Sequence, residues 1–549
     1  MNRLAPISAA PQLDTATPWW RGAAIYQIYP RSFLDSNGDG IGDLPGITAR
    51  LDYVAALGVD AIWISPFFTS PMADFGYDVA DYCDVDPIFG TLADFDALAA
   101  RAHDLGLKVM VDQVYSHTSD QHAWFSESRA SRDSAKADWY VWADPKLDGS
   151  PPNNWQSVFG GPAWTWDARR RQYYLHNFLA SQPQLNVHNP LVQDALLDVA
   201  RFWLERGADG FRIDALNFAM HDPQLRDNPP AGEDGRRRTR PFDFQQQRYN
   251  QSHPHITGFV ERIRALTDHY GAIFTMAEVG GKEAEREMKL FTAGEARLNS
   301  AYGFDFLYAS KLTPAVVAHA LELWPDAPEL GWPSWAFENH DAPRAVSRWA
   351  RPDQREAFAR IKLLLFTALR GNIILYQGEE LGLDQVHIPF EQLRDPEAIT
   401  NWPLTLSRDG ARTPMPWQAQ DEQGGFSQAT PWLPLGEANL ARAADRQEAD
   451  PLSLLHLTRH LIALRNANPA LRLGSSLVLH ADDSTLVLRR SFENQAVLGV
   501  FNLSDAPAAW PAAWPAAAER GTALAALNGA TVGAALPPYG AVLIEENAQ

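Results

Sequence analysis

Gly210-Phe211-Arg212-Ile213-Asp214 is a short apolar run that ends in an arginine and a carboxylate two positions apart. Alternate residues of a β-strand face the same side, so this stretch predicts a strand that directs Arg212 and Asp214 into one cavity. A permanent cation beside Asp214 favours the ionised carboxylate, so we expect the pKa of Asp214 to be lowered and the group to be available as a nucleophile. For this stretch taken alone, a structural ion pair is the alternative.

Similar apolar runs recur along the chain, each followed by a turn and then by an amphipathic helical pattern, as in repeated βα units. The candidate strands are residues 24–28, 61–65, 108–114, 210–214, 273–278, 303–306, 334–338 and 372–376. Helical patterns between them include residues 92–105, 190–206, 256–270 and 352–369. Eight such units predict a closed (β/α)8 TIM barrel, an α/β fold that keeps its active site at the carboxyl ends of its strands.

The spacing of these units predicts further domains. The predicted organisation is a loose leader (1–18), a barrel (19–114 and 189–470), a domain inserted after strand three (115–188), a subdomain after strand eight (378–450) and a C-terminal β-sandwich (471–549). The β-sandwich is indicated by alternating apolar and polar residues, and residues 506–518 are expected to form a loop in it. Residues 226–240 are charged and rich in Pro and Gly, which predicts a surface loop with a solvated basic run.

Composition limits the classes of function. The 549 residues carry 47 Lys and Arg against 67 Asp and Glu, a net charge of −20, which argues against nucleic acid and favours a neutral substrate. No apolar run is long enough to span a membrane, and no signal peptide is evident, so we expect a cytoplasmic protein. The single cysteine, Cys83, is expected to be a buried thiol without a catalytic role.

Three acids fall at or just beyond predicted strand ends: Asp214, Glu278 and Asp341. Adjacent barrel strands present their carboxyl ends around one mouth, so these side chains are expected to converge. Two carboxylates flanking a glycosidic bond are what glycoside hydrolysis requires. Glu278 follows an apolar run, and desolvation there is expected to raise its pKa towards that of a general acid. For any one acid alone, a helix cap or loop ion pair is the alternative.

Several longer motifs carry a family resemblance over residues 19–543. They are Gln27-Ile28-Tyr29-Pro30-Arg31-Ser32-Phe33, Gly76-Tyr77-Asp78, residues 210–214, Asn339-His340-Asp341 and Arg412-Thr413-Pro414-Met415. In this order they resemble the α-amylase superfamily, glycoside hydrolase family thirteen, and within it the bacterial α-glucosidase and oligo-1,6-glucosidase group. The resemblance implies a barrel enzyme that needs no organic cofactor and acts as a monomer or homodimer.

The resemblance also implies roles for individual residues. Asp214 matches the nucleophile, Glu278 the acid/base and Asp341 the third acid, which holds the 2- and 3-hydroxyls of the glucose. Arg212 matches the arginine that orients the nucleophile. The substrate-binding residues implied are Tyr77 as stacking platform, His117 and His340 on the non-reducing glucose, Asp78 and Arg344 as a pair over its 4-hydroxyl, and Phe159, Phe178 and Arg412.

The segment from residue 35 to residue 43 has oxygen ligands at alternate positions with glycines between them, which can wrap a hard cation. It is not an EF-hand, because Gly46 stands where the twelfth-position glutamate would be. The resemblance implies a structural Ca²⁺ or Mg²⁺ site, and a metal-free turn is the alternative. Its ligands would be Asp35, Asn37, Asp39, the Ile41 carbonyl and Asp43.

Departures from the family pattern bear on the substrate. Ser116 and Gln184 stand where asparagine and aspartate are usual, and Asn217-Phe218 replaces the Lys-His of many starch-cleaving members, which favours short substrates. Ala215 follows the nucleophile, and alanine there tends to accompany α-1,4 cleavage. We therefore expect an exo-acting, retaining α-glucosidase that acts on maltose, short malto-oligosaccharides and alkyl or aryl α-glucosides, with transfer to alcohol acceptors.

Two other functions stay open at this point. The first is a glucosyltransferase or isomerase of the same fold acting on sucrose or maltose, since capture of the glucosyl-enzyme by an acceptor depends on loops such as 226–250 and 378–400. The second is a non-catalytic subunit like the heavy chains of certain amino-acid transporters. Those chains have a membrane helix and lack the three acids, so the acids found here count against it.

Overall fold

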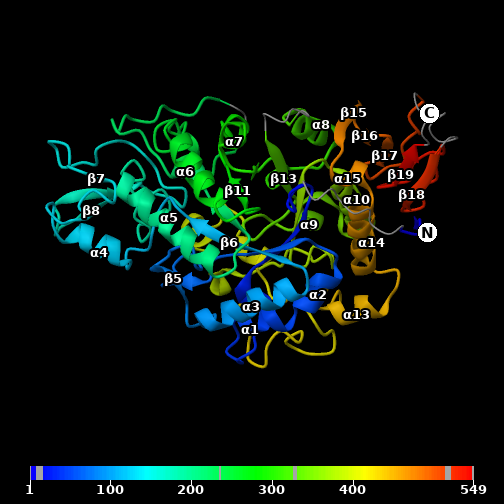
Figure 1. The fold of residues 1–549 in the computed structure, drawn as a ribbon, viewed down its shortest axis with the longest axis horizontal. Helices are drawn as coiled ribbons and strands as arrows, with labels where there is room; N and C mark the ends of the chain where they lie inside the picture. The colour runs from blue at the N-terminus through cyan, green and yellow to red at the C-terminus, as the bar shows by residue number, and fades with distance from the viewer. Residues whose placement is uncertain (1, 8–16, 234–236, 325–330, 513–520, 547–549) are drawn as a thin grey trace.

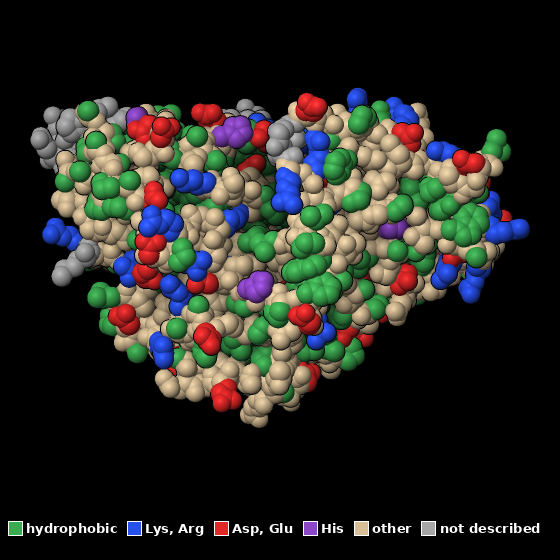
Figure 2. All heavy atoms as spheres, turned by 180° about the vertical axis from the view of Figure 1, so that it is seen from behind, with side chains coloured by type: hydrophobic (Ala, Val, Ile, Leu, Met, Phe, Trp, Pro, Cys, Tyr) green, Lys and Arg blue, Asp and Glu red, His purple; other side chains and the backbone are tan. Residues whose placement is uncertain are grey.

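The structure is a computed structural model that describes residues 2–7, 17–233, 237–324, 331–512 and 521–546. A central barrel carries a small domain at one end and a β-sheet domain at the other, and both chain ends lie beside that sheet domain (Figure 1). Within these ranges no helix is both long and apolar enough to cross a membrane. On the face shown in Figure 2, acidic and basic side chains are interspersed, so the negative charge does not single out a binding surface there.

Eight parallel strands close the barrel in the order β10-β11-β12-β13-β14-β2-β3-β6, which confirms the predicted fold class. They are β2 (Ala24–Ile28), β3 (Ala61–Ile64), β6 (Lys108–Val114), β10 (Gly210–Asp214), β11 (Phe274–Glu278), β12 (Ser300–Tyr302), β13 (Trp332–Ala336) and β14 (Asn372–Tyr376). Almost every residue in them is buried, as expected of a parallel sheet covered on both faces.

One predicted strand is misplaced. The sixth strand is Ser300–Tyr302, not residues 303–306, and Ser300 pairs with Met276 on one side and Trp332 on the other. Glycine weakens a strand interior, and Gly303 follows the strand instead of starting it. The earlier register brings Tyr302 to the strand end beside Glu278, where it contributes to the site.

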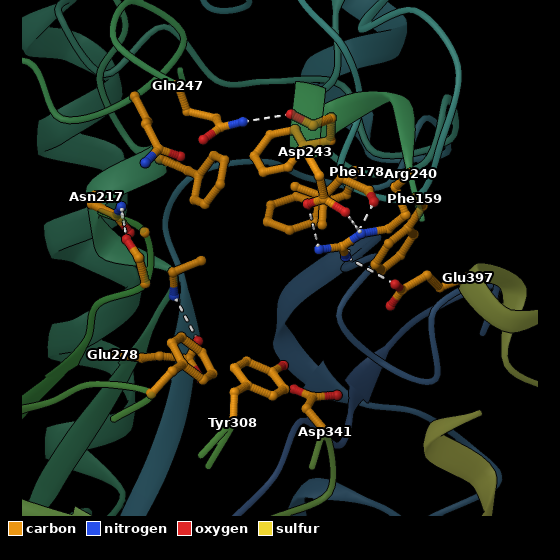
Figure 3. A pocket seen from close by; sticks show the side chains of 18 of the residues that line it. Phe159, Phe178, Asn217, Arg240, Asp243, Gln247, Glu278, Tyr308, Asp341 and Glu397 are labelled. Atoms are coloured by element: carbon orange, nitrogen blue, oxygen red, sulfur yellow. Dashed lines mark hydrogen bonds and ion pairs between the residues drawn. The ribbon is translucent and has the colours of Figure 1, made fainter. Parts of the chain in front are cut away.

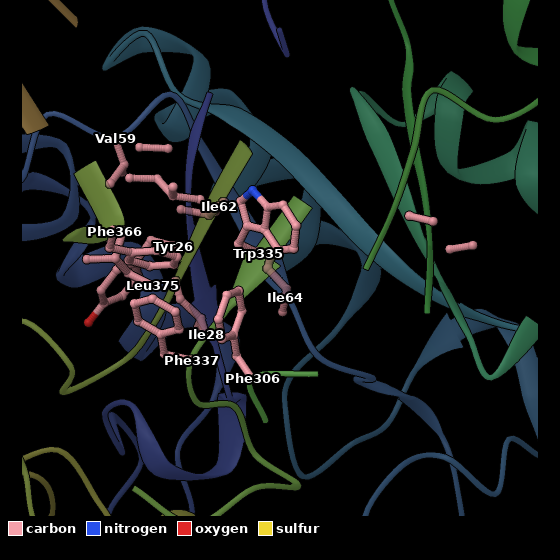
Figure 4. Close-up of a cluster of buried hydrophobic side chains, with 14 of the residues drawn as sticks. Tyr26, Ile28, Val59, Ile62, Ile64, Phe306, Trp335, Phe337, Phe366 and Leu375 are labelled. Carbon is pink, nitrogen blue, oxygen red and sulfur yellow. The ribbon is translucent and has the colours of Figure 1, made fainter. Parts of the chain in front are cut away.

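Helices cover the outside of the barrel, and several of them begin at a side-chain cap. They are α1 (Leu44–Ala49), α2 (Leu51–Ala56), α3 (Leu92–Asp104), α5 (Pro190–Glu205), α6 (Ile256–Asp268), α7 (Ala284–Thr292), α8 (Pro314–Glu322), α9 (Ala345–Trp349) and α10 (Arg355–Ala368). Thr91 and Asp94 form a capping box at the start of α3, and Asn189 caps α5 ahead of a proline. Apolar strand residues such as Ile62 and Leu375 pack under these helices, with Phe337 stacked on Phe366 at 4.6 Å (Figure 4).

Two insertions rise from the carboxyl ends of the strands. Between β6 and α5 lie α4 (Ala123–Ala130) and a three-stranded sheet of β7 (Trp142–Ala143), β9 (Gln172–Leu175) and β8 (Trp164–Asp167), with its own core around Trp155 and Trp164. After β14 the chain forms α11 (Pro396–Asn401), α12 (Glu437–Leu440) and α13 (Ala444–Ala449). A short ladder of β4 (Phe68–Thr69) and β5 (Asp81–Val85) follows β3.

The C-terminal domain is connected by α14 (Leu454–Ala467) and α15 (Pro469–Arg472) and forms one six-stranded antiparallel sheet in the described residues. The strands are β1 (Arg3–Leu4), β15 (Ser475–Ala481), β16 (Thr485–Phe492), β17 (Gln495–Asn502), β18 (Gly521–Leu527) and β19 (Ala541–Glu546). Leu486 and Leu488 join the main core, whereas Val487 packs with Leu536 on the other face. Irregular chain thus covers that second face, where the predicted sandwich would have a second sheet.

The prediction of a loose leader needs correction, because β1 pairs with β18 in antiparallel register. Leu4 lies opposite Ala525, so the first residues complete the edge of the C-terminal sheet. The remainder of the predicted leader, residues 8–16, lies outside the described residues, as do residues 513–518 of the predicted loop in the C-terminal domain.

Candidate active site

A cavity of about 920 Å³ opens at the carboxyl ends of the barrel strands. Its walls come from four parts of the chain: the strand ends, the inserted domain, residues 237–251 and the subdomain after β14. Glu278, Tyr308 and Asp341 lie towards the bottom of the view in Figure 3, with Arg240, Asp243 and Glu397 across the cavity from Glu278. The three predicted acids, Asp214, Glu278 and Asp341, all line this one cavity.

Arg212 lies fully buried beneath the cavity and joins the acids. Its Nη1 atom donates to Asp214 at 2.7 Å and to Asp112 at 2.9 Å, and its Nη2 atom is 2.5 Å from Glu278. The Arg212 and Asp214 side chains therefore share one face of β10, as the alternation in the strand predicts. A single guanidinium thus faces three carboxyl groups.

Burial determines how this cluster holds protons. Burial of Asp214, together with Glu278 and Asp112 nearby, raises its pKa well above the usual value, although Arg212 acts in the opposite direction. Burial also raises the pKa of Asp112, to about 6. The lowered pKa expected for Asp214 is therefore wrong in direction, because the Arg-x-Asp pattern does not reveal how completely the pair is removed from water. Three acids around one cation favour retention of a proton within the cluster.

Glu278 ends β11 and is held from two sides. The Tyr302 hydroxyl donates to its Oε1 atom at 2.9 Å, and the backbone N–H of Ala215 donates to Oε2 at 3.2 Å. Tyr302 in turn accepts hydrogen bonds from Arg212. Ala215 is in the left-handed region, at φ 37°, so the turn after the nucleophile is a strained one that directs its N–H to Glu278.

Asp341 lies in the loop after β13, among positive groups. Arg412 donates to its Oδ1 atom at 2.6 Å and Arg408 at 3.0 Å, and His340 Nε2 is 3.2 Å from Oδ2. Burial alone would raise the pKa of Asp341, but His340 and the two guanidinium groups lower it well below its usual range. Asp341 is therefore a carboxylate at neutral pH.

Tyr77 and His117 line the cavity, and His340 packs against Tyr77. Tyr77 stacks on His340 with ring centroids 5.4 Å apart, and His117 donates from Nε2 to the Tyr77 carbonyl at 3.1 Å. Burial lowers the pKa of His117 to about 4 and that of His340 to about 3, so both rings are neutral at pH 7. Gln27 donates to His340 Nδ1 at 2.8 Å, which leaves the proton of His340 on Nε2, beside Asp341.

Five of the predicted substrate-binding residues do not line the cavity: Arg212, His340 and Arg412, which contact its acids, and Asp78 and Arg344. Asp78 is fully buried and accepts hydrogen bonds from Ser70 and from the backbone of residues 73 and 74, and the fully buried Arg344 donates to the carbonyls of Gln377 and Ala411. The predicted pairing of Asp78 with Arg344 over the sugar is therefore corrected. Both side chains instead form hydrogen bonds that stabilise loops.

Asp74 and Arg408, which the sequence motifs did not single out, line the cavity beside Asp341. Arg408 donates to Asp74 at 3.2 Å and to Asp341, and its guanidinium lies 5.0 Å from the ring centroid of Phe159. Burial raises the pKa of Asp74 to about 6. The sequence feature that could have identified them is their spacing from two motif residues. Asp74 lies three residues before Tyr77, and Arg408 lies four residues before Arg412.

The remaining predicted substrate contacts divide into two kinds. Phe159 and Phe178 line the cavity, with centroids 5.7 Å apart. Arg412 is 1% exposed and donates to Asp341 and to the His340 carbonyl, so it acts on the site through Asp341. The two departures from the family pattern also have partners: Ser116 donates to His117 Nδ1 at 2.9 Å, and Gln184 donates to the Phe218 carbonyl at 2.7 Å.

The cavity rim contains a basic segment that the sequence analysis placed in solvent. Arg237, Arg238 and Arg240 line the cavity; Arg237 is exposed, in agreement with a solvated run, whereas Arg240 is partly buried and paired. Arg240 pairs with Asp243 at 3.1 Å and with Glu397 at 2.9 Å, and thereby joins its own segment to the subdomain after β14 (Figure 3). Residues 234–236 lie outside the described residues.

The predicted cation loop is closed by its own hydrogen bonds. Asp35 accepts from the backbone N–H groups of residues 37, 38 and 40 and from the Ser427 hydroxyl, and Asp43 caps α1 through Gly46. The oxygen donors fit a hard cation in chemistry. The three carboxylates of the loop do not all approach one another within 4.8 Å. Among the described residues, one group of three His, Cys, Asp or Glu ligand atoms is that close, and it lies outside this loop.

Known proteins are similar to this chain over most of its length. The family model described as the alpha-amylase catalytic domain matches residues 27–474. A probable alpha-glucosidase of Rhizobium meliloti (strain 1021) is 54% identical over 502 residues, which cover 90% of this chain and 91% of that protein. An oligo-1,6-glucosidase of Parageobacillus thermoglucosidasius is 35% identical over 523 residues, or 89% of this chain and 91% of that protein.

Among solved structures, that of an alpha-glucosyl transfer enzyme, XgtA, is similar throughout. It superposes with a TM-score of 0.91 at 50% sequence identity and covers 97% of this chain and 100% of that chain. The similarity thus includes the barrel, both insertions and the C-terminal sheet.

Proposed function

Because this chain belongs to the α-amylase family of glycoside hydrolases, we propose that it is a retaining, exo-acting α-glucosidase. Relatives named as α-glucosidase and oligo-1,6-glucosidase assign it to the bacterial α-glucosidase group, as its motifs predict. The substrates we propose are maltose, short malto-oligosaccharides and alkyl or aryl α-glucosides.

The observation that carries the proposal is a set of linked ion pairs in the wall of the cavity. Asp74, Arg408 and Asp341 are linked to one another by ion pairs and all line the same cavity as Asp214 and Glu278. A terminal glucose would meet hydrogen-bonding groups there, and a longer chain could not extend past them. This arrangement supports removal of single glucose units from chain ends.

The reaction follows from two carboxyl groups in different settings. Glu278, held by Tyr302 and the Ala215 N–H, would give its proton to the glycosidic oxygen as the bond to the anomeric carbon breaks. Asp214 would attack that carbon to form a β-glucosyl-enzyme. Glu278 would then take a proton from water, whose oxygen displaces Asp214 and restores the α-configuration.

The preference proposed for α-1,4 linkages rests on Ala215. This residue lines the cavity directly after the nucleophile, at a positive φ where a β-branched side chain would be strained. A small side chain leaves room beside the leaving glucose. Such differences in packing are worth about 1–3 kcal/mol of discrimination.

Transfer of glucose to alcohols is the second part of the proposal. Its support is the similarity to a structure titled as an α-glucosyl transfer enzyme, together with a rim made of residues 237–251 and Glu397. The alternative is a glucosyltransferase or isomerase acting on sucrose or maltose, which would form the same glucosyl-enzyme and differ in what intercepts it.

One experiment separates these outcomes. The purified protein is incubated with maltose, isomaltose, sucrose or trehalose, and sugars and anomers are followed by proton NMR. Rapid release of α-glucose from maltose, with little from isomaltose, is the expected result. Initial release of β-glucose would exclude retention, a rearranged disaccharide would assign an isomerase, and no turnover of any sugar would contradict the enzyme assignment.

We also propose that the loop from Asp35 to Asp43 binds a structural Ca²⁺ or Mg²⁺ ion. The support is its donor set of carboxylate, amide and carbonyl oxygens within nine residues. The ion would take no part in the chemistry.

A further inference from the structure

Three histidines gather at a place that the proposed reaction does not use. One imidazole nitrogen each from His188, His253 and His255 lies within 4.8 Å of the other two. None of the three lines the active-site cavity. Such a group of ligand-bearing side chains occurs once among the residues that the structure describes.

The orientation of His188 is fixed by a backbone contact. Its Nε2 atom is 2.7 Å from the carbonyl oxygen of His221, and because a carbonyl only accepts, the proton of His188 lies on Nε2. The lone pair on Nδ1 is therefore available. A metal-bound histidine usually donates its other ring N–H to a carbonyl or carboxylate in this way.

The three rings are close without stacking on one another. The centroids of His188 and His253 are 4.9 Å apart, those of His253 and His255 are 4.6 Å apart, and both pairs meet edge to face. Neutral imidazole is the form that binds a metal.

We propose that His188, His253 and His255 form a binding site for a divalent transition-metal ion such as Zn²⁺. Imidazole nitrogens suit Zn²⁺, Ni²⁺ and Cu²⁺, whereas Ca²⁺ and Mg²⁺ require oxygen ligands. His255 is exposed, so the fourth coordination position would face solvent and hold water. This site is therefore distinct in chemistry from the loop that begins at Asp35.

The position of the site gives it a structural consequence. His188 lies where the chain returns from the inserted domain to α5. His253 and His255 lie between residues 237–251, here called the rim segment, and α6. The rim segment includes Gln247 and Gln251, which line the active-site cavity. A bound ion would tie the end of the rim segment to the base of the inserted domain, and a ligand that binds only the folded state raises the unfolding temperature.

The test uses the full-length protein stripped of metal and kept in Mg²⁺, so that the oxygen-rich loop does not compete. Zn²⁺ is titrated by calorimetry into the native protein and into His253→Gln and His255→Gln variants. His319→Gln is the matched control, because His319 is an exposed histidine on α8 paired with Glu285 and outside the cluster. The unfolding temperature is measured with and without Zn²⁺.

The expected result is one Zn²⁺ per native chain, with an affinity about tenfold or more weaker in either cluster variant and unchanged in the control. Zn²⁺ should raise the unfolding temperature of the native protein and of the control only. In addition, Co²⁺ should give visible absorption bands with the native protein that the cluster variants lack, provided that circular dichroism shows them folded. Equal affinity in native and cluster variants, or no saturable binding to the native protein, would overturn the proposal.

Discussion

At the scale of the residue, Arg212 governs the charge of the proposed site. One fully buried guanidinium contacts three carboxyl groups, those of Asp112, Asp214 and Glu278, of which the last two line the cavity. Three carboxyl groups around one cation favour retention of one proton in the cluster. The proposed reaction likewise moves a single proton between Glu278 and the leaving or attacking oxygen. Because Arg212 contacts both Asp214 and Glu278, it can hold the two carboxyl groups in place through both halves of the proposed reaction.

Replacement of these acids by amides tests their roles. Asp214→Asn and Glu278→Gln should each lower kcat on maltose by about a thousandfold or more, because each removes a group that forms or breaks a bond. Asp305→Asn is the control, since Asp305 lines the same cavity and is not among the partners of Arg212. Steady-state kinetics and unfolding temperatures are measured together. Near-native activity in either acid variant would remove that residue from its role.

Some residues of the site are predictable from the sequence and others are not. Asp214 and Glu278 end hydrophobic runs, so their place at the barrel mouth follows from the strand pattern. Asp74 lies in a turn and Arg408 begins a short 3-10 helix, where the local pattern does not show which way a side chain points. Asp78, which the resemblance implies as a sugar contact, points into its own loop. The pKa direction of Asp214 was missed because burial is a property of the assembled fold.

At the scale of the element, the cation proposed for the loop from Asp35 to Asp43 can be tested by its effect on stability. Removal of metal by a chelator should lower the unfolding temperature by about 2 °C or more, because an ion bound only to the folded state stabilises it. Catalytic activity at low temperature should change little, and Ca²⁺ or Mg²⁺ should restore stability. Asp39→Asn should abolish the response to chelator. An unchanged unfolding temperature after verified removal would favour the turn closed by its own hydrogen bonds.

Helix α7 contains a buried acid that gives a pH prediction. Burial raises the pKa of Glu287 from 4.5 to about 7, although the neighbouring Ser252, Arg286 and Asn217 act in the opposite direction. Between pH 4.5 and 7 the folded chain keeps this proton while the unfolded chain loses it. Stability should therefore fall as pH rises through this window, by at most about 3 kcal/mol, and level off above it.

A comparison of variants on the same helix isolates this effect. Between pH 5 and pH 8 the unfolding temperature of Glu287→Gln should fall less than that of the native protein. The unfolding temperature of Glu285→Gln, changed on the exposed face of α7, should fall as much as that of the native protein. Parallel curves for all three proteins would show that Glu287 does not hold its proton in the folded state.

Not every barrel strand can be predicted from its sequence. Seven barrel strands are predicted within two residues because their apolar runs are long, whereas β12 has three residues and includes Ser300. The Ser300 hydroxyl donates to the Trp332 carbonyl, which makes a polar residue acceptable inside the barrel. A short strand stabilised by such a tertiary contact carries no clear local signal.

At the scale of the whole molecule, the barrel supplies the acids and the insertions supply the rim. Arg240 joins three of these parts, because it pairs with Asp243 in its own segment and with Glu397 after β14, and donates to the Val158 carbonyl of the inserted domain. None of these contacts involves Asp214, Glu278 or Asp341. Arg240 is therefore suited to hold the shape of the acceptor side while leaving the glucose end of the cavity intact.

This division predicts that Arg240→Ala changes what happens to the glucosyl-enzyme more than how it forms. The value of kcat/KM for an aryl α-glucoside should stay near native, while the ratio of alcohol transfer to hydrolysis should fall, because a loosened rim admits water and orders the acceptor less well. Arg226→Ala is the control, since Arg226 is exposed and pairs with Asp222 away from the cavity. Product ratios are measured by proton NMR with maltose and an added alcohol. An unchanged ratio in Arg240→Ala would mean that the rim does not select the acceptor, and an equal fall in the control would assign the effect to the segment as a whole.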